Sequence, residues 1–183
     1  MAKLRIKIRE MDKNDVDSVE KLEIASYGEH HWSKDSFLGE LTNDYAHYFV
    51  AVNNENNNII GYYGLWHILE EVHILNISVS PDYRRRSVGE ALLVHAINYC
   101  LENEVKYITL EVRVSNIPAK NLYEKYGLKS LGIRKGYYQD NNEDADIMWS
   151  ENIFYEKFQN LYKSNVCKLN EKIEILGNEK TSI

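Results

Sequence analysis

Residues Ile77 to Gly89 read Ile-Ser-Val-Ser-Pro-Asp-Tyr-Arg-Arg-Arg-Ser-Val-Gly. A short β-branched strand reaches Pro81, a tight basic turn follows, and an apolar-periodic helix begins near Val88. This order places free backbone N–H groups and three arginines at the N-terminus of a helix. Such a terminus carries partial positive charge and unpaired donors, so the stretch predicts a site for a phosphate-bearing ligand.

The bulk properties predict one soluble globular domain. The chain has 183 residues, of which 44% are hydrophobic and 27% are charged. That length suits one well-packed core better than two. The N-terminal stretch from Met1 to Glu10 lacks the apolar core of a signal peptide, and no window approaches the roughly 20 apolar residues of a membrane span. We therefore expect a cytoplasmic protein that does not bind membranes.

The net charge of −6 argues against direct nucleic-acid binding and fits a basic protein or peptide as partner. The two cysteines, Cys100 and Cys167, form no disulfide framework and are expected to be reduced thiols. The six histidines show no His-x-x-x-His pair and no neighbouring cysteine, so we expect no metal site.

Periodicity predicts alternating strands and helices as far as residue 153. Asp12 is the expected N-cap of the first helix and Ser33 that of the second, whereas Pro118 suits the first turn of a later one. The predicted strands are residues 5–9, 45–52, 59–69, 71–79, 107–114, 128–138 and 144–153. The predicted helices carry Val16 to Leu22, Phe37 to Leu41, residues 88–102 and Pro118 to Gly127.

This order predicts an α/β fold with a mixed central sheet flanked by helices. Neighbouring strands early in the chain indicate an antiparallel part, and the strand–helix–strand units at 71–112 and 107–137 indicate a parallel part. A closing hairpin follows. We expect one domain over residues 1–155 and a polar C-terminal extension over 156–183, either helical or unpacked.

Five segments together carry a family resemblance, which covers most of residues 5–153. They are EVHILNISVSPDYR (71–84), LEVRVSN (110–116), NLYEKYG (121–127), IRKGYY (133–138) and EDADIM (143–148). In this order and spacing they resemble the GNAT superfamily of N-acetyltransferases, and within it the ribosomal-protein-alanine N-acetyltransferases. The resemblance implies transfer of an acetyl group from acetyl-CoA to the N-terminal amine, typically alanine, of a small-subunit ribosomal protein.

The resemblance assigns the basic turn to the pyrophosphate of coenzyme A. The family's turn has the form Arg/Gln-x-x-Gly-x-Gly/Ala, and Ser87 replaces its first glycine, which costs about 1–2 kcal/mol if a left-handed conformation is required. Asn116 matches a coenzyme-contacting asparagine, although a helix cap explains it equally well. The expected coenzyme-binding residues are Ile77, Ser78, Val79, Arg84, Arg85, Arg86, Ser87, Val88, Gly89, Glu90 and Asn116.

The same resemblance assigns the catalytic roles to Glu111 and Tyr123. An α-ammonium group with a pKa of roughly 7.7–8.0 must lose a proton before it attacks a thioester, and Glu111 matches the family's general base. Tyr123 matches the tyrosine that donates a proton to the leaving thiolate. Read without the resemblance, Glu111 is a solvated strand residue and Tyr123 is a packing side chain.

Trp32, Glu71, Tyr137 and Tyr138 are candidates to line a groove for the acceptor peptide. Related N-terminal acetyltransferases use a Tyr-Tyr pair on the late hairpin, although such a pair is more often packing. The ribosomal-protein-alanine type commonly has Pro-Trp-Ser where this chain has His31-Trp-Ser33.

Two other functions stay open at this point. A GNAT enzyme can act on a small amine or a lysine, whose pKa of roughly 10.4 demands stronger deprotonation. Ser87 also motivates a coenzyme-binding module with little catalysis.

We expect a monomer or a weak homodimer.

Overall fold

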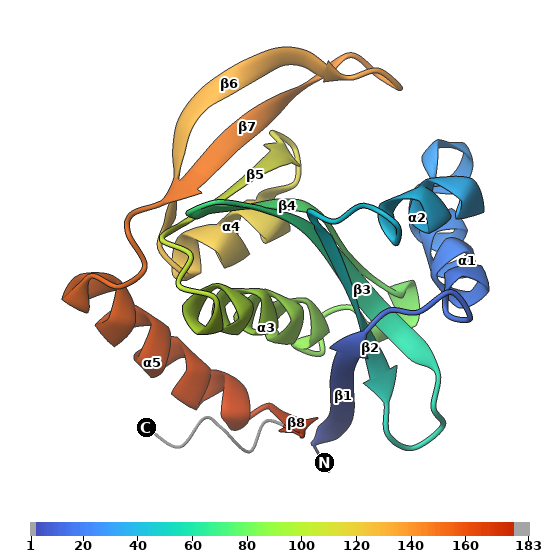
Figure 1. The fold of residues 1–183 in the computed structure, drawn as a ribbon, viewed down its shortest axis with the longest axis horizontal. Coiled ribbons are helices and arrows are strands. Elements are labelled where there is room, and N and C mark those ends of the chain that lie inside the picture. The colour runs from blue at the N-terminus through green and yellow to red at the C-terminus, as the bar shows by residue number, and fades with distance from the viewer. Residues whose placement is uncertain (1–2, 178–183) are drawn as a thin grey trace.

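The computed structural model describes residues 3–177 as one mixed α/β unit (Figure 1). The strands are β1 (Leu4–Glu10), β2 (Ala46–Asn53), β3 (Ile59–Ile68), β4 (Glu71–Val79), β5 (Tyr107–Arg113), β6 (Leu128–Tyr138), β7 (Glu143–Ser150) and β8 (Ile173–Leu176). The helices are α1 (Val16–Tyr27), α2 (Lys34–Glu40), α3 (Val88–Glu102), α4 (Ile117–Lys125) and α5 (Glu156–Asn170), with 3₁₀ turns η1 (Gly28–His30) and η2 (Pro81–Tyr83). The predicted architecture is confirmed.

Within the described residues the strands form one sheet in the order β6-β7-β5-β4-β3-β2-β1-β8. Strands β1 to β4 pair antiparallel, β4 pairs parallel with β5, and β6 and β7 form the expected hairpin, which curves away from the rest of the sheet (Figure 1). The second predicted strand–helix–strand unit is only partly right. Strand β7 lies between β5 and β6 and pairs antiparallel with both, so these two strands do not pair with each other.

Each face of the sheet carries its own core because successive strand residues point to opposite faces. On one face, Val50 and Tyr62 pack with α1 and α2. On the other face, Ala51 and Tyr63 pack with α3, α4 and α5. Helices α1 and α2 therefore lie on one face of the sheet, and helices α3, α4 and α5 lie on the other.

The N-cap of α1 differs from the expectation. The helix begins at Val16, one residue after Asp15, and the Asp12 carboxylate instead accepts from the N–H of Asn14 at 2.7 Å. Asp15 is held by Arg9, whose two terminal nitrogens donate to its carboxylate at 2.6 and 2.8 Å. The prediction at Ser33 is confirmed, since its hydroxyl accepts from the N–H of Ser36 at 3.2 Å.

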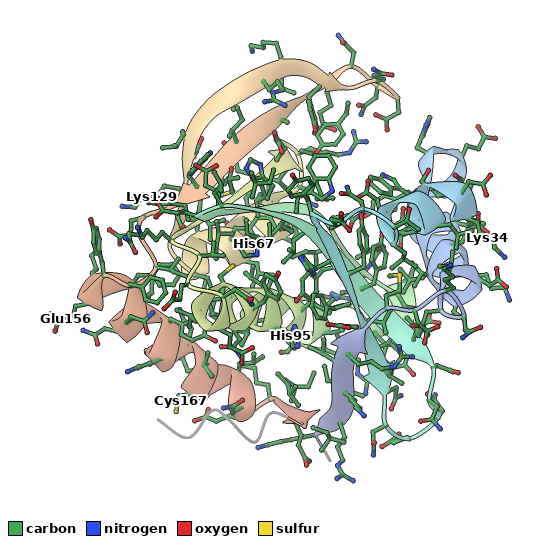
Figure 2. The ribbon with its side chains drawn as sticks, in the orientation of Figure 1. Lys34, His67, His95, Lys129, Glu156 and Cys167 are labelled. Carbon is green, nitrogen blue, oxygen red and sulfur yellow. The ribbon has the colours of Figure 1, made fainter. Side chains whose placement is uncertain are left out.

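The described part of the expected C-terminal extension packs on the same core as the rest of the chain. Helix α5 buries Phe158 and Leu169 in the main core, and β8 pairs parallel with β1 at the edge of the sheet. A polar composition hid this because only one stripe of α5 is apolar. Figure 2 shows Glu156 and Cys167 on α5, across the molecule from Lys34 of α2. Residues 178–183 of the extension lie outside the described residues.

No helix among residues 3–177 combines the length and the apolar composition needed to cross a bilayer. The same residues include no group of three or more histidine, cysteine, aspartate or glutamate side chains placed to hold a metal ion.

Candidate active site

Strands β4 and β5 separate partway along their length. Their parallel pairing runs from Glu71–Tyr107 to Ile74–Leu110 and ends there. At the same point β4 carries a bulge, because Gly64 pairs with Asn76 and the next residue, Leu65, pairs with Ile74, which leaves Leu75 as an extra residue. A bulge bends its strand. The edge of β4 beyond Ile74 is therefore open toward the gap, where its backbone groups can pair with an extended ligand.

A cavity of about 260 Å³ fills this gap. Its walls come from α1 and the following loop, β4, β5, α4 and the end of β6. The lining residues are Glu23, Tyr27, His30, Trp32, Ile74, Leu75, Asn76, Ile77, Leu110, Glu111, Val112, Arg113, Asn116, Tyr123 and Tyr138.

Eight of the 17 site residues predicted from the sequence lie at this cavity or on the open strand edge. The cavity is lined by Trp32, Ile77, Glu111, Asn116, Tyr123 and Tyr138. Ser78 and Val79 continue the β4 edge, where they pair with β3 on the other side. Tyr137 packs edge-on against Tyr138, with ring centroids 5.1 Å apart.

The structure does not bring Glu71 to the cavity. Glu71 starts β4, and it lines a different cavity of about 330 Å³ together with Tyr107 and Trp149. Its carboxylate lies 3.3 Å from Nε2 of His73. This second cavity lies at the paired end of β4 and β5, whereas Glu111 lies where the strands have parted.

The basic turn connects β4 to α3 through two residues in left-handed conformations. Arg85 has φ 56° and Ser87 has φ 63°. Ser87 precedes α3, and its carbonyl accepts the first helical bond, from the N–H of Ala91 at 3.0 Å. The N–H groups of Val88, Gly89 and Glu90 thus form the first turn, which has no acceptors within the helix.

Ser87 therefore adopts the left-handed conformation, which is strained for serine. Replacing it by glycine is expected to stabilise the fold. A non-glycine residue in this region costs about 1–2 kcal/mol, partly offset by the greater entropy of glycine in the unfolded chain. We expect Ser87→Gly to raise the free energy of unfolding by about 1 kcal/mol in urea denaturation. A loss of stability would mean that the Ser87 hydroxyl contributes more than the strain removes.

Glu90 turns its carboxylate away from the open end of α3 and toward α4. It accepts from the hydroxyl of Tyr126 at 2.7 Å and forms an ion pair with Lys125. Its negative charge is thereby compensated, and the first turn of α3 is tied to the end of α4.

Glu111 lies in β5, opposite Ile147 of β7. Its carboxylate lies 3.1 Å from the Arg134 guanidinium of β6, and 28% of its side-chain surface is exposed. The guanidinium carbon of Arg134 also lies 5.2 Å from the centroid of the Tyr137 ring. The hairpin thus supplies a positive charge to the candidate base, which the sequence did not indicate.

Tyr123 is held by α4, whose start is well defined. Asn116 caps the helix by accepting from the N–H of Ala119 at 3.3 Å, and Pro118 occupies the first turn as predicted. Burial, followed by the neighbouring Tyr27 and Tyr138, raises the pKa of Tyr123 above its ordinary value. The hydroxyl therefore stays protonated near neutral pH and is available as a donor.

Arg113 organises the far wall of the cavity. Its guanidinium lies 3.9 Å from the centroid of the Tyr138 ring and donates to Asp140 at 2.7 Å and to Glu143 at 3.1 Å. Burial is the largest cause that raises the pKa of Tyr138, to about 12, while Arg113 opposes it. Arg113 thus joins the turn of the β6–β7 hairpin to the cavity.

Sequence reasoning missed Glu23, which is 2% exposed and lines the cavity from α1. The spacing of the apolar residues in α1 could have indicated its position. Val16, Val19 and Glu23 are all buried and lie three and four residues apart, so an acidic residue occupies the apolar face of the helix.

A family model described as the acetyltransferase (GNAT) family matches residues 14–128. The chain belongs to this family. A Bacillus subtilis protein named provisionally as a ribosomal protein bS18-alanine N-acetyltransferase is 44% identical over 148 residues, which are 80% of this chain and 96% of that protein. The Escherichia coli K12 ribosomal protein bS18-alanine N-acetyltransferase is 35% identical over 119 residues, 64% of this chain and 78% of that protein.

Solved structures agree with this GNAT assignment. The crystal structure of the ribosomal-protein-S18-alanine N-acetyltransferase from Escherichia coli superposes with a TM-score of 0.73 at 30% identity, over 80% of this chain and 93% of that one. The predicted family and the predicted acetyltransferase class are therefore confirmed.

Proposed function

We propose that this GNAT acetyltransferase transfers an acetyl group from acetyl-CoA to the N-terminal α-amine of a ribosomal protein, with alanine as the acceptor residue. The observation that carries the proposal is that Glu111 and Tyr123 line one cavity beside an open strand edge, in a chain 44% identical to a bS18-alanine N-acetyltransferase. A ribosomal acceptor implies that the reaction takes place in the cytoplasm.

The basic turn and the open edge of β4 fit coenzyme A. The N–H groups of Val88, Gly89 and Glu90, with Arg84 to Arg86, offer donors and positive charge to a pyrophosphate. The open edge of β4 at Ile77 to Val79 offers backbone groups to an extended pantetheine arm. When bound, acetyl-CoA supplies the thioester carbonyl that the amine attacks.

Glu111 is the proposed proton acceptor. An α-amine with a pKa of roughly 7.7–8.0 is mostly protonated at neutral pH, so a carboxylate at the cavity must remove the proton before attack. The Arg134 guanidinium lies 3.1 Å from the Glu111 carboxylate and balances its negative charge.

Tyr123 is the proposed donor to the departing sulfur, and removing its hydroxyl is expected to slow the reaction. A thiolate with a parent pKa near 8.5 leaves moderately well, so we expect Tyr123→Phe to lower kcat by about 10²-fold, the lower end for a general acid. Steady-state kinetics with an alanine peptide measure kcat, and calorimetry measures acetyl-CoA binding, which should not change.

The control for Tyr123→Phe is Tyr162→Phe. Tyr162 is also buried, but its hydroxyl donates to Asn98 at 2.5 Å, on α3 where α5 packs. Equal losses of kcat in the two variants would remove Tyr123 from the reaction and indicate a general packing effect.

The acceptor end of the cavity is formed by Trp32 and Tyr138, from the α1–α2 loop and the β6–β7 hairpin. Trp32 packs on Phe37 with centroids 5.7 Å apart, and Tyr138 is held by Arg113. A net charge of −6 favours approach of a basic ribosomal protein.

The acceptor is tested with three substrates and isotope-labelled acetyl-CoA. The first is a peptide with the N-terminal sequence of bS18 beginning at alanine, the second is the same peptide with a blocked N-terminus and an internal lysine, and the third is a polyamine. Mass spectrometry should place the label on the α-amine of the first peptide. Label on lysine or the polyamine would support the other GNAT reactions, and coenzyme binding without any transfer would support a binding module.

A further inference from the structure

Glu23 lines the same cavity as Glu111 and Tyr123, from the α1 side, and only 2% of its surface is exposed. Glutamate is rarely buried to this extent without a partner. Its position therefore calls for a chemical explanation beyond packing.

Two neutral donors fix the orientation of this carboxylate. The hydroxyl of Tyr62 on β3 donates to Oε1 at 2.5 Å, and the backbone N–H of Trp32 donates to Oε2 at 3.1 Å. A carboxylate has about four acceptor positions, so two remain for a ligand in the cavity. Through these bonds Glu23 also connects α1, β3 and the loop that carries Trp32.

The charge of Glu23 has no cation beside it. Among residues 3–177, no lysine, arginine or histidine nitrogen lies within 4 Å of its carboxylate, whereas Glu111 is paired with Arg134. Burial is the largest cause that raises the pKa of Glu23, and the bonds from Tyr62 and Trp32 and the more distant His31 imidazole only partly oppose it. A buried carboxylate is costly unless it is paired, so the site lacks one positive charge.

We propose that Glu23 binds the α-ammonium group of the acceptor peptide and holds it in the cavity beside Glu111. The inference rests on the proposed function and deepens it. An ammonium group carries three N–H donors, so it can donate to Glu23 and still present a proton to Glu111. The two carboxylates then have different roles. Glu23 supplies charge for binding, and Glu111, already neutralised by Arg134, accepts the proton.

The test compares binding of two peptides to the coenzyme A complex of the enzyme by calorimetry. One peptide begins with alanine, and the other begins with a propionyl group, in which hydrogen replaces the α-amine. Hydrogen bonds between charged groups are the strong ones, so the wild-type enzyme should bind the alanine peptide at least about tenfold more tightly. In Glu23→Gln this preference should fall about tenfold through loss of the alanine peptide's affinity alone.

Two further variants separate ammonium binding from support of the fold. Tyr62→Phe removes a bond to Glu23 but keeps the carboxylate, so it should keep the preference. Asp17→Asn removes an exposed charge from the same helix and should change neither affinity. Coenzyme binding and thermal unfolding show whether each variant is folded.

The outcomes distinguish this inference from the proposed function. If Glu23→Gln weakens both peptides equally, or keeps the preference, Glu23 only supports the Trp32 loop and the inference is wrong. If the wild-type enzyme neither prefers nor acetylates the alanine peptide, the proposed function itself fails.

Discussion

Replacing Glu111 by glutamine is expected to lower kcat for an alanine peptide by about 10²–10⁴-fold at neutral pH, the range for loss of a general base. Glutamine keeps the size of the side chain but cannot accept the proton of the ammonium group. Because Glu111 lies at the cavity and not at the basic turn, the Kd for acetyl-CoA should stay unchanged. Steady-state kinetics measure the first quantity and calorimetry the second.

The pH dependence of Glu111→Gln gives a sharper test than the loss itself. As pH rises from about 7 to about 9.5, the free α-amine with its pKa of roughly 7.7–8.0 loses its proton to solvent. The variant should then recover part of its deficit relative to wild type. Glu124→Gln, which changes a carboxylate on α4 outside the cavity lining, should keep wild-type kcat. Full turnover of Glu111→Gln at pH 7 would exclude Glu111 as the base.

Local patterns in the sequence were sufficient to predict the strands and helices that form the cavity. Alternating residues in β4 and β5, the cap at Ser33 and the proline at position 118 act over a few residues, so the sequence displays them directly. The placement of Glu111 and Tyr123 at one cavity follows from the strand–helix order, since β5 leads into α4. Their chemical roles came from the resemblance to GNAT enzymes.

The features that the sequence did not predict depend on contacts between distant residues. The pairing of β8 with β1 joins Leu4 to Ile173, and the four residues of β8 carry too little pattern to be recognised. The pairing of β7 with both β5 and β6 likewise depends on contacts between residues that are distant in the sequence. Glu23 and Arg134 were missed because the importance of each charge depends on what the fold places beside it.

The C-terminal helix is expected to contribute strongly to stability, and Phe158→Ala tests this directly. Phe158 is 1% exposed, stacks on Tyr162 and lies against Gly127, where a Cβ atom would meet its ring at 3.3 Å. Gly127 has φ 88° just after α4, so a larger residue there would be strained as well as crowded. Removing the ring leaves a cavity between α5 and the end of α4.

We expect Phe158→Ala to lower the free energy of unfolding by about 3–5 kcal/mol, the usual cost of deleting a buried phenylalanine. Chemical denaturation measures it, and Phe154→Ala is the matched control because Phe154 is 46% exposed and should cost less than about 1 kcal/mol. Asn165 donates to the carbonyl of Lys125 at 2.7 Å, so α5 also holds the end of the helix that carries Tyr123. A small loss, equal to that of Phe154→Ala, would mean that α5 unfolds separately from the GNAT core. A large loss in a single transition would mean that the core and the C-terminal helix fold as one cooperative unit.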